Sequence, residues 1–235
     1  LLAEKVETYE KYQLALEMGF SYFQGFFFSK PEMVQSKTLP PSEMALAELL
    51  YETSSIDLNL RKITEVFERD VNLSYKLLRY SNSAAFKRRA EISTIKQALI
   101  VLGSEEIKRF LSLLFAAQVS ADKPAELIRL SLTRARFAEL LAISHGKLRD
   151  TGMAFLTGMM SLMDAILDED MPSVMKKLPL SNDIKAALLD EEGQLAVYLR
   201  LVKQYEQANW QGAKDIQHEL GLAPEEVPDA YHDAV

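Results

Sequence analysis

The chain of 235 residues contains no cysteine, only three histidines and a single tryptophan. Without cysteine it forms no disulfide and offers no thiolate to a metal ion. With so few histidines, it also has little of the imidazole that transition-metal centres use. Absence of cysteine suits a reducing compartment, and we expect a cytoplasmic protein.

Long apolar runs and an excess of positive charge are also missing. The longest apolar run, residues 110–117, contains a serine and is far shorter than the roughly 20 residues that span a bilayer. The chain has 27 basic and 34 acidic residues, a net charge of −7, whereas nucleic-acid binding depends on concentrated positive charge. Basic residues cluster at Lys87-Arg88-Arg89 and at Arg129, Arg134 and Arg136. A solvated turn and a helix face account for these clusters, so we predict neither a nucleic-acid nor a membrane partner.

Helical patterns fill the chain from residue 42 onward, most clearly between Asp70 and Gly103. There, one amphipathic helix begins near Asp70 and ends at the polar break 81–83, where side chains compete for backbone hydrogen bonds. A second helix stops at Gly103, and Ser104 begins a third. Helices joined so closely bury their apolar faces only by folding back on one another. We therefore predict an all-α, multi-helix bundle.

The N-terminal part follows a different pattern. After a predicted helix over 1–18, residues 20–28 form an aromatic-rich apolar run, FSYFQGFFF. Such a run is typical of a strand buried on both faces in a parallel sheet or barrel. Pro40-Pro41 holds the chain extended. We predict a helix–strand unit over 1–35, a linker over 36–41 and a helical domain over 42–235.

The run from Asp70 to Gly103 resembles the HDOD (HD-related output domain) family. The matching residues are Asp70, Leu73, Leu77, Leu78, Asn82, Ser83, Ile92, Thr94, Ile95, Ala98, Leu102 and Gly103. The resemblance implies a helical bundle like that of HD-type phosphohydrolases, and a regulatory role in bacterial signalling through contacts with other proteins.

The same resemblance implies that the metal site of those enzymes is lost. Their metal-binding His-Asp pair follows Gly-Leu-Leu, and the matching stretch here puts Ser161 and Leu162 in its place. Leucine has no atom that ligates a cation. We therefore expect no metal, no cofactor and no catalysis by this chain. A weaker alternative is adventitious metal at His145, or at the acids near Asp164.

A second resemblance covers residues 1–35. AEKVET followed by GFSYFQGFFFSKP is similar to the final helix and strand of an EAL domain, a TIM-like barrel that hydrolyses cyclic di-GMP with divalent metal. By this resemblance Glu4 and Gln24 take active-site positions, while Lys5 stands where the family has glycine. Two such groups do not make a two-metal site. From the residues alone, Glu4 is a solvated acid and Gln24 a paired polar group in a strand.

Three functions follow. The first is a non-catalytic module that contacts other signalling proteins or domains, including an upstream EAL barrel. The second is part of a cyclic di-GMP phosphodiesterase whose catalytic barrel lies upstream, since the chain begins without methionine and reads as a fragment. The third is a small-ligand sensor with a pocket near Asn82 and Arg134.

Two structural questions accompany these functions. Asn82 and Ser83 either bind a ligand or partner, or cap the carbonyls at a helix end. The apolar strand over 20–28 needs a cover, which we expect to be the helical domain or a second copy of the chain in a homodimer.

Overall fold

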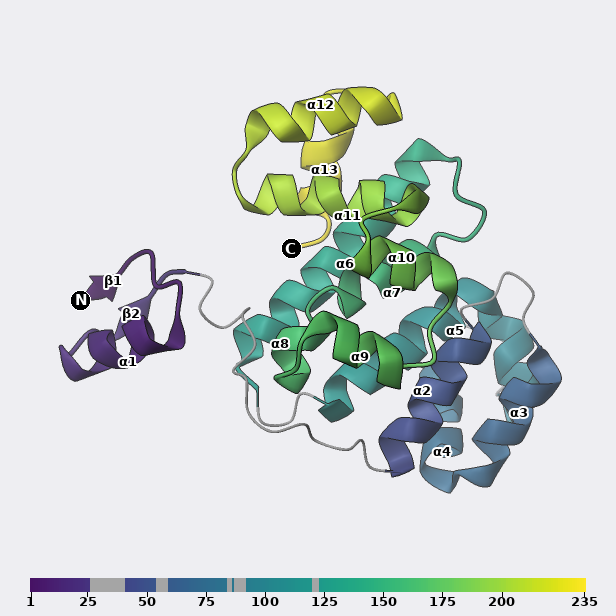
Figure 1. Ribbon diagram of the computed structural model, residues 1–235. Helices are drawn as coiled ribbons and strands as arrows, with labels where there is room; N and C mark the ends of the chain where they lie inside the picture. Colours follow the sequence, from purple (N-terminus) through teal and green to yellow (C-terminus); the bar gives the residue numbers. More distant parts are fainter. Residues whose placement is uncertain (26–40, 54–58, 84–85, 87–91, 120–122) are drawn as a thin grey trace.

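The computed structural model describes residues 1–25, 41–53, 59–83, 86, 92–119 and 123–235, and most of these residues are helical (Figure 1). Its N-terminal elements are β1 (Leu2–Ala3), α1 (Tyr9–Glu17) and β2 (Tyr22–Phe23). The first half of the bundle contains α2 (Pro41–Thr53), α3 (Leu60–Arg69), α4 (Val71–Ser81), α5 (Ile95–Val119) and α6 (Ala125–His145). The second half contains α7 (Gly152–Met160), α8 (Met163–Leu167), α9 (Met171–Lys177), α10 (Asn182–Leu189), α11 (Gly193–Glu206), α12 (Trp210–Leu220) and α13 (Glu226–His232).

The N-terminal unit is a strand–helix–strand. β1 and β2 pair in parallel, with Leu2 opposite Tyr22, and α1 is the crossover between them. The helix predicted over 1–18 is therefore wrong at its start. Thr8 begins α1 instead, because its hydroxyl accepts a hydrogen bond from the Lys11 backbone N–H (3.3 Å). Of the strand predicted over 20–28, the described part forms a strand only at 22–23, and residues 26–28 lie outside the described residues.

The first helices of the bundle begin and end where local signals place them. α2 starts at Pro41, one residue inside the predicted linker, and residues 36–40 of that linker lie outside the described residues. Asp70 starts α4, since its carboxylate accepts hydrogen bonds from the backbone N–H groups of Asn72 (2.9 Å) and Leu73 (3.0 Å). α5 breaks at Gly103, whose φ of 73° and ψ of 175° are not helical, so the predicted stop is confirmed.

The core of the bundle lies around α7. Every residue of this helix is buried, as expected of a helix that carries no charge on any face. α6 packs directly against α7 at Gly158, where a β-carbon would lie 2.6 Å from the Arg134 carbonyl oxygen. Glycine is therefore the residue that lets the two helices approach so closely.

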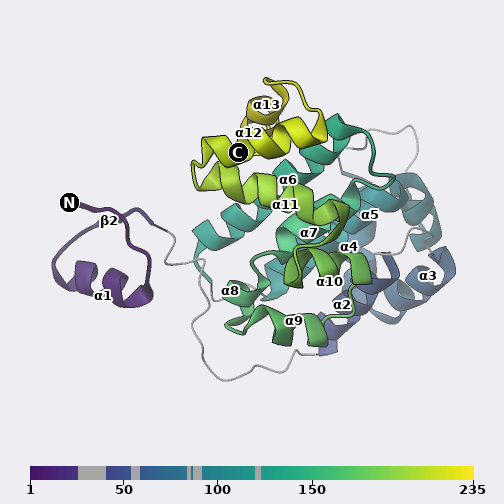
Figure 2. The ribbon, with the colours of Figure 1, turned by 45° about the horizontal axis from the view of Figure 1, so that its top comes forward.

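The C-terminal helices α11 to α13 form a cap over α6, visible at the top of Figures 1 and 2. The acidic stretch from Pro224 to Val235 contains α13, which buries Val227 and Ala230. Tyr231 packs against Phe137 of α6, with a ring-centroid distance of 5.4 Å. Among the described residues, no helix combines the length and hydropathy that a bilayer span requires.

Candidate functional site

The predicted remnant of the metal-binding pair lies at the junction of α7 and α8. Ser161 ends α7, and its hydroxyl donates to the Gly158 carbonyl oxygen (2.6 Å). Leu162 follows as an apolar core residue with only 3% of its surface exposed. The pair therefore provides one hydroxyl, already bonded, and one hydrocarbon side chain.

Arg134 occupies the space in front of Ser161. Its Nη1 donates to the Ser161 hydroxyl (3.2 Å), while its Nε and Nη2 donate to the two carboxylate oxygens of Glu206 (2.8–3.0 Å). The Arg134 and Glu206 side chains are only 11% and 9% exposed. Three helices, α6, α7 and α11, thus meet at a bidentate ion pair. The positive charge beside Ser161 is that of the Arg134 guanidinium.

Asp164 lies beside this ion pair. Burial raises the pKa of its carboxyl group, and the neighbouring Arg134 charge and the Ala165 backbone N–H (2.8 Å) partly oppose that rise. The other acids of this stretch are separated from one another. Asp168 pairs with Lys123 (2.5 Å) and Glu169 with Lys177 (2.6 Å), while Asp170 caps α9. Within the described ranges, no three histidine or acidic side chains come together as a metal-ligand group.

The basic cluster on α6 divides into three environments. Arg134 pairs with Glu206, as described. Arg136 donates to Glu139 (2.6 Å), a carboxylate with no exposed surface that also accepts from Arg109 (2.5 Å). Arg129 is exposed and faces a cavity. Of the three, Arg134 joins α6 to neighbouring helices, whereas Arg129 and the 40% exposed side chain of Arg136 remain on the predicted solvated helix face.

Asn82 caps α4 and bonds to Ile92. Its amide nitrogen donates to the carbonyl oxygens of Leu78 (2.9 Å) and Ile92 (2.8 Å), and its amide oxygen accepts from the Ile92 backbone N–H (2.8 Å). Both amide hydrogens are thus used inside the protein. Ser83 continues the cap through a bond from its backbone N–H to the Tyr80 carbonyl oxygen (3.0 Å).

The two residues of the predicted sensor pocket belong to different parts of the bundle. α4, which Asn82 ends, lies at its lower end in Figure 1, whereas α6, which carries Arg134, crosses its centre. Each side chain has partners of its own.

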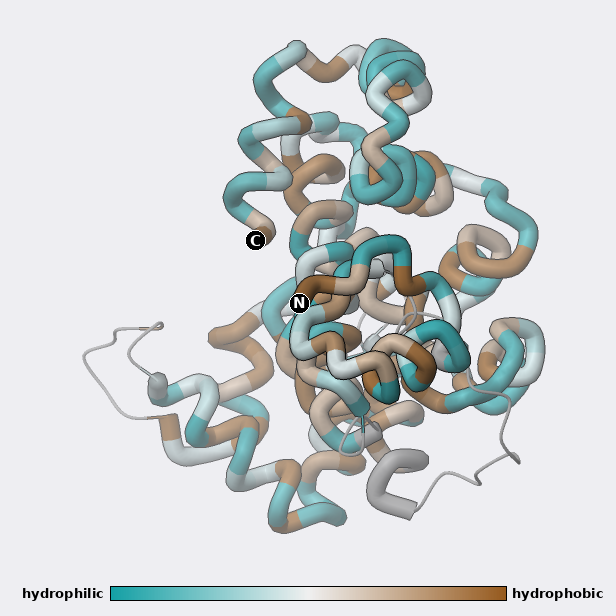
Figure 3. Tube along the Cα trace, turned by 90° about the vertical axis from the view of Figure 1, so that its left-hand side faces the viewer, coloured by the Kyte–Doolittle hydropathy of each residue, from teal (hydrophilic) through white to brown (hydrophobic). Residues whose placement is uncertain are grey.

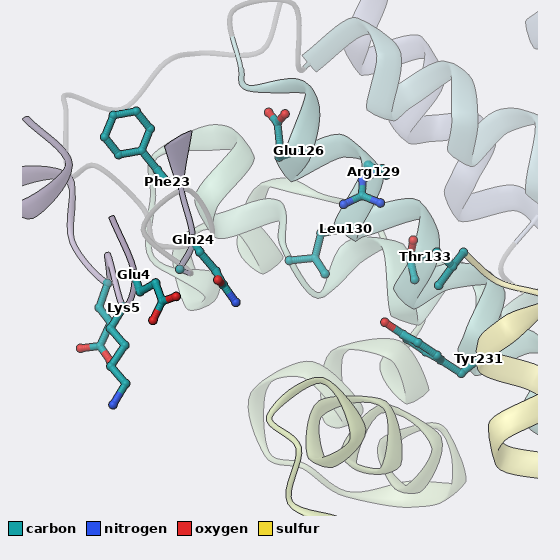
Figure 4. Close-up of a pocket in the computed structure, with 12 residues that line it drawn as sticks. Glu4, Lys5, Phe23, Gln24, Glu126, Arg129, Leu130, Thr133 and Tyr231 are labelled. Carbon is teal, nitrogen blue, oxygen red and sulfur yellow. The ribbon is translucent and has the colours of Figure 1, made fainter. Parts of the chain in front are cut away.

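Glu4 and Gln24 share a cavity of about 600 Å³ with the bundle. The N-terminal unit contributes these two residues, Lys5, Glu7, Phe23 and Gly25, and the bundle contributes Glu126, Arg129, Leu130, Thr133, Tyr231 and Val235. Figure 4 shows the Gln24 amide and the Tyr231 hydroxyl pointing toward one another across this space. We refer to it as the inter-unit cavity.

His145 ends α6, as the sequence indicates, and contacts Tyr198 of α11. Its Nδ1 lies 2.7 Å from the Tyr198 hydroxyl, which also accepts from the Gln194 amide (3.2 Å). Burial, followed by the nearby Lys147 charge, lowers the pKa of His145. His218 and His232 are exposed on other helices.

Sequence reasoning missed Glu206 and Tyr231. Glu206 is 72 residues from its partner Arg134, and nothing local marks it. For Tyr231, a usable signal was the spacing of apolar residues 227, 230 and 231 within an otherwise acidic stretch.

Comparison with known proteins bears on this fold and this site. The model of the HDOD domain matches residues 39–178, which is more than half of the chain. The chain belongs to the HDOD family. The HDOD match includes α2 to α9, and with them Asn82, Arg134 and the degenerate pair Ser161–Leu162.

Two curated relatives extend the similarity beyond the HDOD domain. The chain is 38% identical over 226 residues to the cyclic di-GMP phosphodiesterase CdgJ of Vibrio cholerae, covering 96% of this chain and 52% of CdgJ. It is 35% identical over 237 residues to YuxH of Bacillus subtilis, covering 100% of this chain and 57% of YuxH. The chain thus spans about half the length of the curated relatives it matches.

Two solved structures share the fold. One is a Marinobacter aquaeolei protein described as a signal transduction protein. Its TM-score is 0.57 at 15% identity, and the match covers 86% of this chain and 60% of that one. The other is a Shewanella amazonensis protein described as a metal-dependent phosphohydrolase. Its TM-score is 0.55 at 17% identity, and the match covers 86% of this chain and 91% of that one. The helical arrangement of the HDOD bundle is therefore that of solved signalling and HD-like proteins.

Proposed function

We propose that this chain is a non-catalytic regulatory module of a signalling protein linked to cyclic di-GMP, and that it acts through protein–protein contacts. The observation that carries the proposal is the ion pair at the degenerate site. The Arg134 guanidinium bonds both Ser161 and Glu206, so the polar groups at this position already have a cationic partner. A metal ion there would have to displace a bidentate arginine and would meet leucine as its next neighbour.

We further propose that residues 1–25 belong to the end of an EAL barrel. Support comes from the parallel pairing of β1 with β2 across α1, because parallel strands joined by a helix are the unit from which α/β barrels are built. Lys5, which stands where the EAL family has glycine, has a φ of 55°, a left-handed conformation that glycine adopts freely. Gly25 lies against Val6 so closely that a β-carbon would overlap the Val6 backbone.

The exposed apolar residues of the N-terminal unit also fit a missing neighbour. Leu1, Leu14, Met18 and Tyr22 each expose more than half of their surface. Among the described residues the sheet has two strands, and a sheet of this size is marginal alone, so further strands would stabilise it and cover its edges. This agrees with relatives about twice the length of the chain.

The test compares metal content and cyclic di-GMP hydrolysis of this chain with those of the protein extended upstream to the length of CdgJ. We expect a metal-free, inactive chain and hydrolysis only in the longer protein. Stoichiometric metal or hydrolysis in the chain would overturn the non-catalytic assignment. Inactivity of both proteins would remove the phosphodiesterase link and leave a scaffold.

A small-ligand sensor is the second candidate, and the observation that favours it is the inter-unit cavity. Its volume of about 600 Å³ lies within the range of small-molecule sites. Thermal shift with a panel of nucleotides tests this, because a ligand that binds only the folded state raises the melting temperature.

A further inference from the structure

The inter-unit cavity brings together charged and polar groups that have no partner in the described chain. No hydrogen bond or ion pair joins the Arg129 guanidinium to another described residue, and the same holds for the side chains of Glu4 and Gln24. Figure 4 shows these groups on facing walls, with Glu4 and Gln24 on one and Arg129 on the other. Unpaired groups of opposite sign that face each other are a mark of a docking surface.

Both walls carry charges of both signs. The N-terminal unit presents Glu4 and Glu7 beside Lys5, and the bundle presents Arg129 beside Glu126. Glu7 already pairs with Lys11 of its own unit (3.6 Å), which leaves Glu4 as the acid available to Arg129. An approach that brings Glu4 toward Arg129 is electrostatically favourable, whereas one that brings Glu4 toward Glu126 is not.

The wall on the bundle is rigid and partly apolar. Tyr231 is fixed by Tyr205 and Phe137, with ring-centroid distances of 4.9 and 5.4 Å, and Leu130 lies between Arg129 and Tyr231 in Figure 4. On the opposite wall, Phe23 packs edge-on against Tyr12 at 4.7 Å. Both surfaces therefore offer aromatic contact area without a large cost in side-chain entropy.

We propose that the face formed by α6 and α13 is the docking surface for the N-terminal unit, with Arg129 as the cation that faces Glu4. In the docked state the HDOD bundle is one wall of the cleft that contains Glu4 and Gln24, so a signal that alters the bundle reaches these residues directly. This docking surface is the contact through which the proposed regulatory role would act. The inference rests on the proposed function only for its biological meaning.

The test measures a distance in the intact chain. Because the chain lacks cysteine, spin labels attach only where cysteine is introduced, at Gln13→Cys on α1 and Glu219→Cys on α12, both of which are exposed. A second pair within the bundle, Glu68→Cys and Glu219→Cys, is the reference for intrinsic label mobility. We expect a single narrow inter-unit distribution, no more than twice as wide as that of the reference pair.

Charge variants then test the role of Arg129. Arg129→Glu should broaden the inter-unit distribution at least twofold, Arg129→Lys should leave it narrow, and the swap Arg129→Glu with Glu4→Lys should narrow it again. Lys96→Glu, which makes the same charge change on α5 away from the cavity, should have no effect. Raising the salt from 0.05 to 0.5 M should broaden the native distribution, because the facing groups are exposed.

Two outcomes would overturn the proposal. A broad inter-unit distribution in the native chain would refute docking, and a narrow distribution unaffected by Arg129→Glu would refute the assignment of Arg129. The measurement involves no catalysis, so failure of cyclic di-GMP hydrolysis in the longer protein leaves its result unchanged.

Discussion

Removal of Arg134 should destabilise the bundle far more than removal of an exposed arginine. Arg134→Met keeps the length of the apolar stem but leaves the Glu206 carboxylate, 9% exposed, without its bidentate partner. An unpaired buried charge costs about 3–5 kcal/mol. For a chain of this size, each kcal/mol lowers the melting temperature by about 2–4 °C, so we expect a loss of about 6–20 °C.

The double variant Arg134→Met with Glu206→Leu separates the cost of the unpaired charge from the net value of the pair. Replacing both partners with apolar groups of similar volume is often neutral, so the double variant should recover most of the lost stability. Arg61→Met is the matched control, because Arg61 forms an i,i+4 pair with Glu65 while its side chain is 89% exposed. Such a pair contributes about 0–1 kcal/mol.

Urea denaturation followed by circular dichroism measures five proteins at one pH and one salt concentration: the native chain, Arg134→Met, Glu206→Leu, the double variant and Arg61→Met. The reasoning is refuted if Arg134→Met costs no more than Arg61→Met. It is also refuted if the double variant is as unstable as the sum of the two single variants, because a coupled pair is not additive.

Four further variants test other parts of the structure. Asn82→Ala removes the bonds to Leu78 and Ile92 and should cost about 1–3 kcal/mol in urea denaturation, whereas Asn72→Ala on exposed α4 surface should cost under about 0.5 kcal/mol. Gly158→Ala should cost about 1–3 kcal/mol or more by forcing α6 away from α7, measured in the same way. Gly25→Ala should expose residues 1–25 to proteolysis, while Gly19→Ala, where a β-carbon meets no atom within 4 Å, should cost only about 1 kcal/mol. The pKa of His145 is lowered in the folded chain, so its contribution to stability is complete above pH 6.5 and is lost as the pH falls from 6.5 toward the lowered pKa. His145→Gln should therefore flatten this part of the curve of unfolding free energy against pH. An unchanged slope would contradict the assignment of this pH dependence to His145.

The helical bundle was predictable because its signals are local. Asp70 caps α4 through atoms only two and three residues away, and Gly103 breaks α5 through its own backbone angles. The uncharged sequence of α7 by itself indicates burial. Each of these features depends on residues within one turn or one helix, which is the range over which sequence patterns are informative.

The rest depended on contacts between distant residues. Lys108 resembles any charged residue on a helix, yet it is fully buried and pairs with Asp150, 42 positions away. Glu206 likewise has no local signal, and without it Arg134 reads as an available ligand contact. β1 was missed because two residues form no periodic pattern, and a strand of this length exists only through pairing with β2.

The Asn82 amide joins the end of α4 to the residue that precedes α5 by three positions, because it bonds both the backbone N–H and the carbonyl oxygen of Ile92. One side chain thereby fixes where the second helix starts relative to the end of the first. Holding both backbone groups of Ile92 requires a side chain that donates and accepts at the same time, which an amide does and a carboxylate or an ammonium group does not. The relative placement of α4 and α5 therefore depends on the chemistry of this amide as well as on the apolar contacts between the two helices.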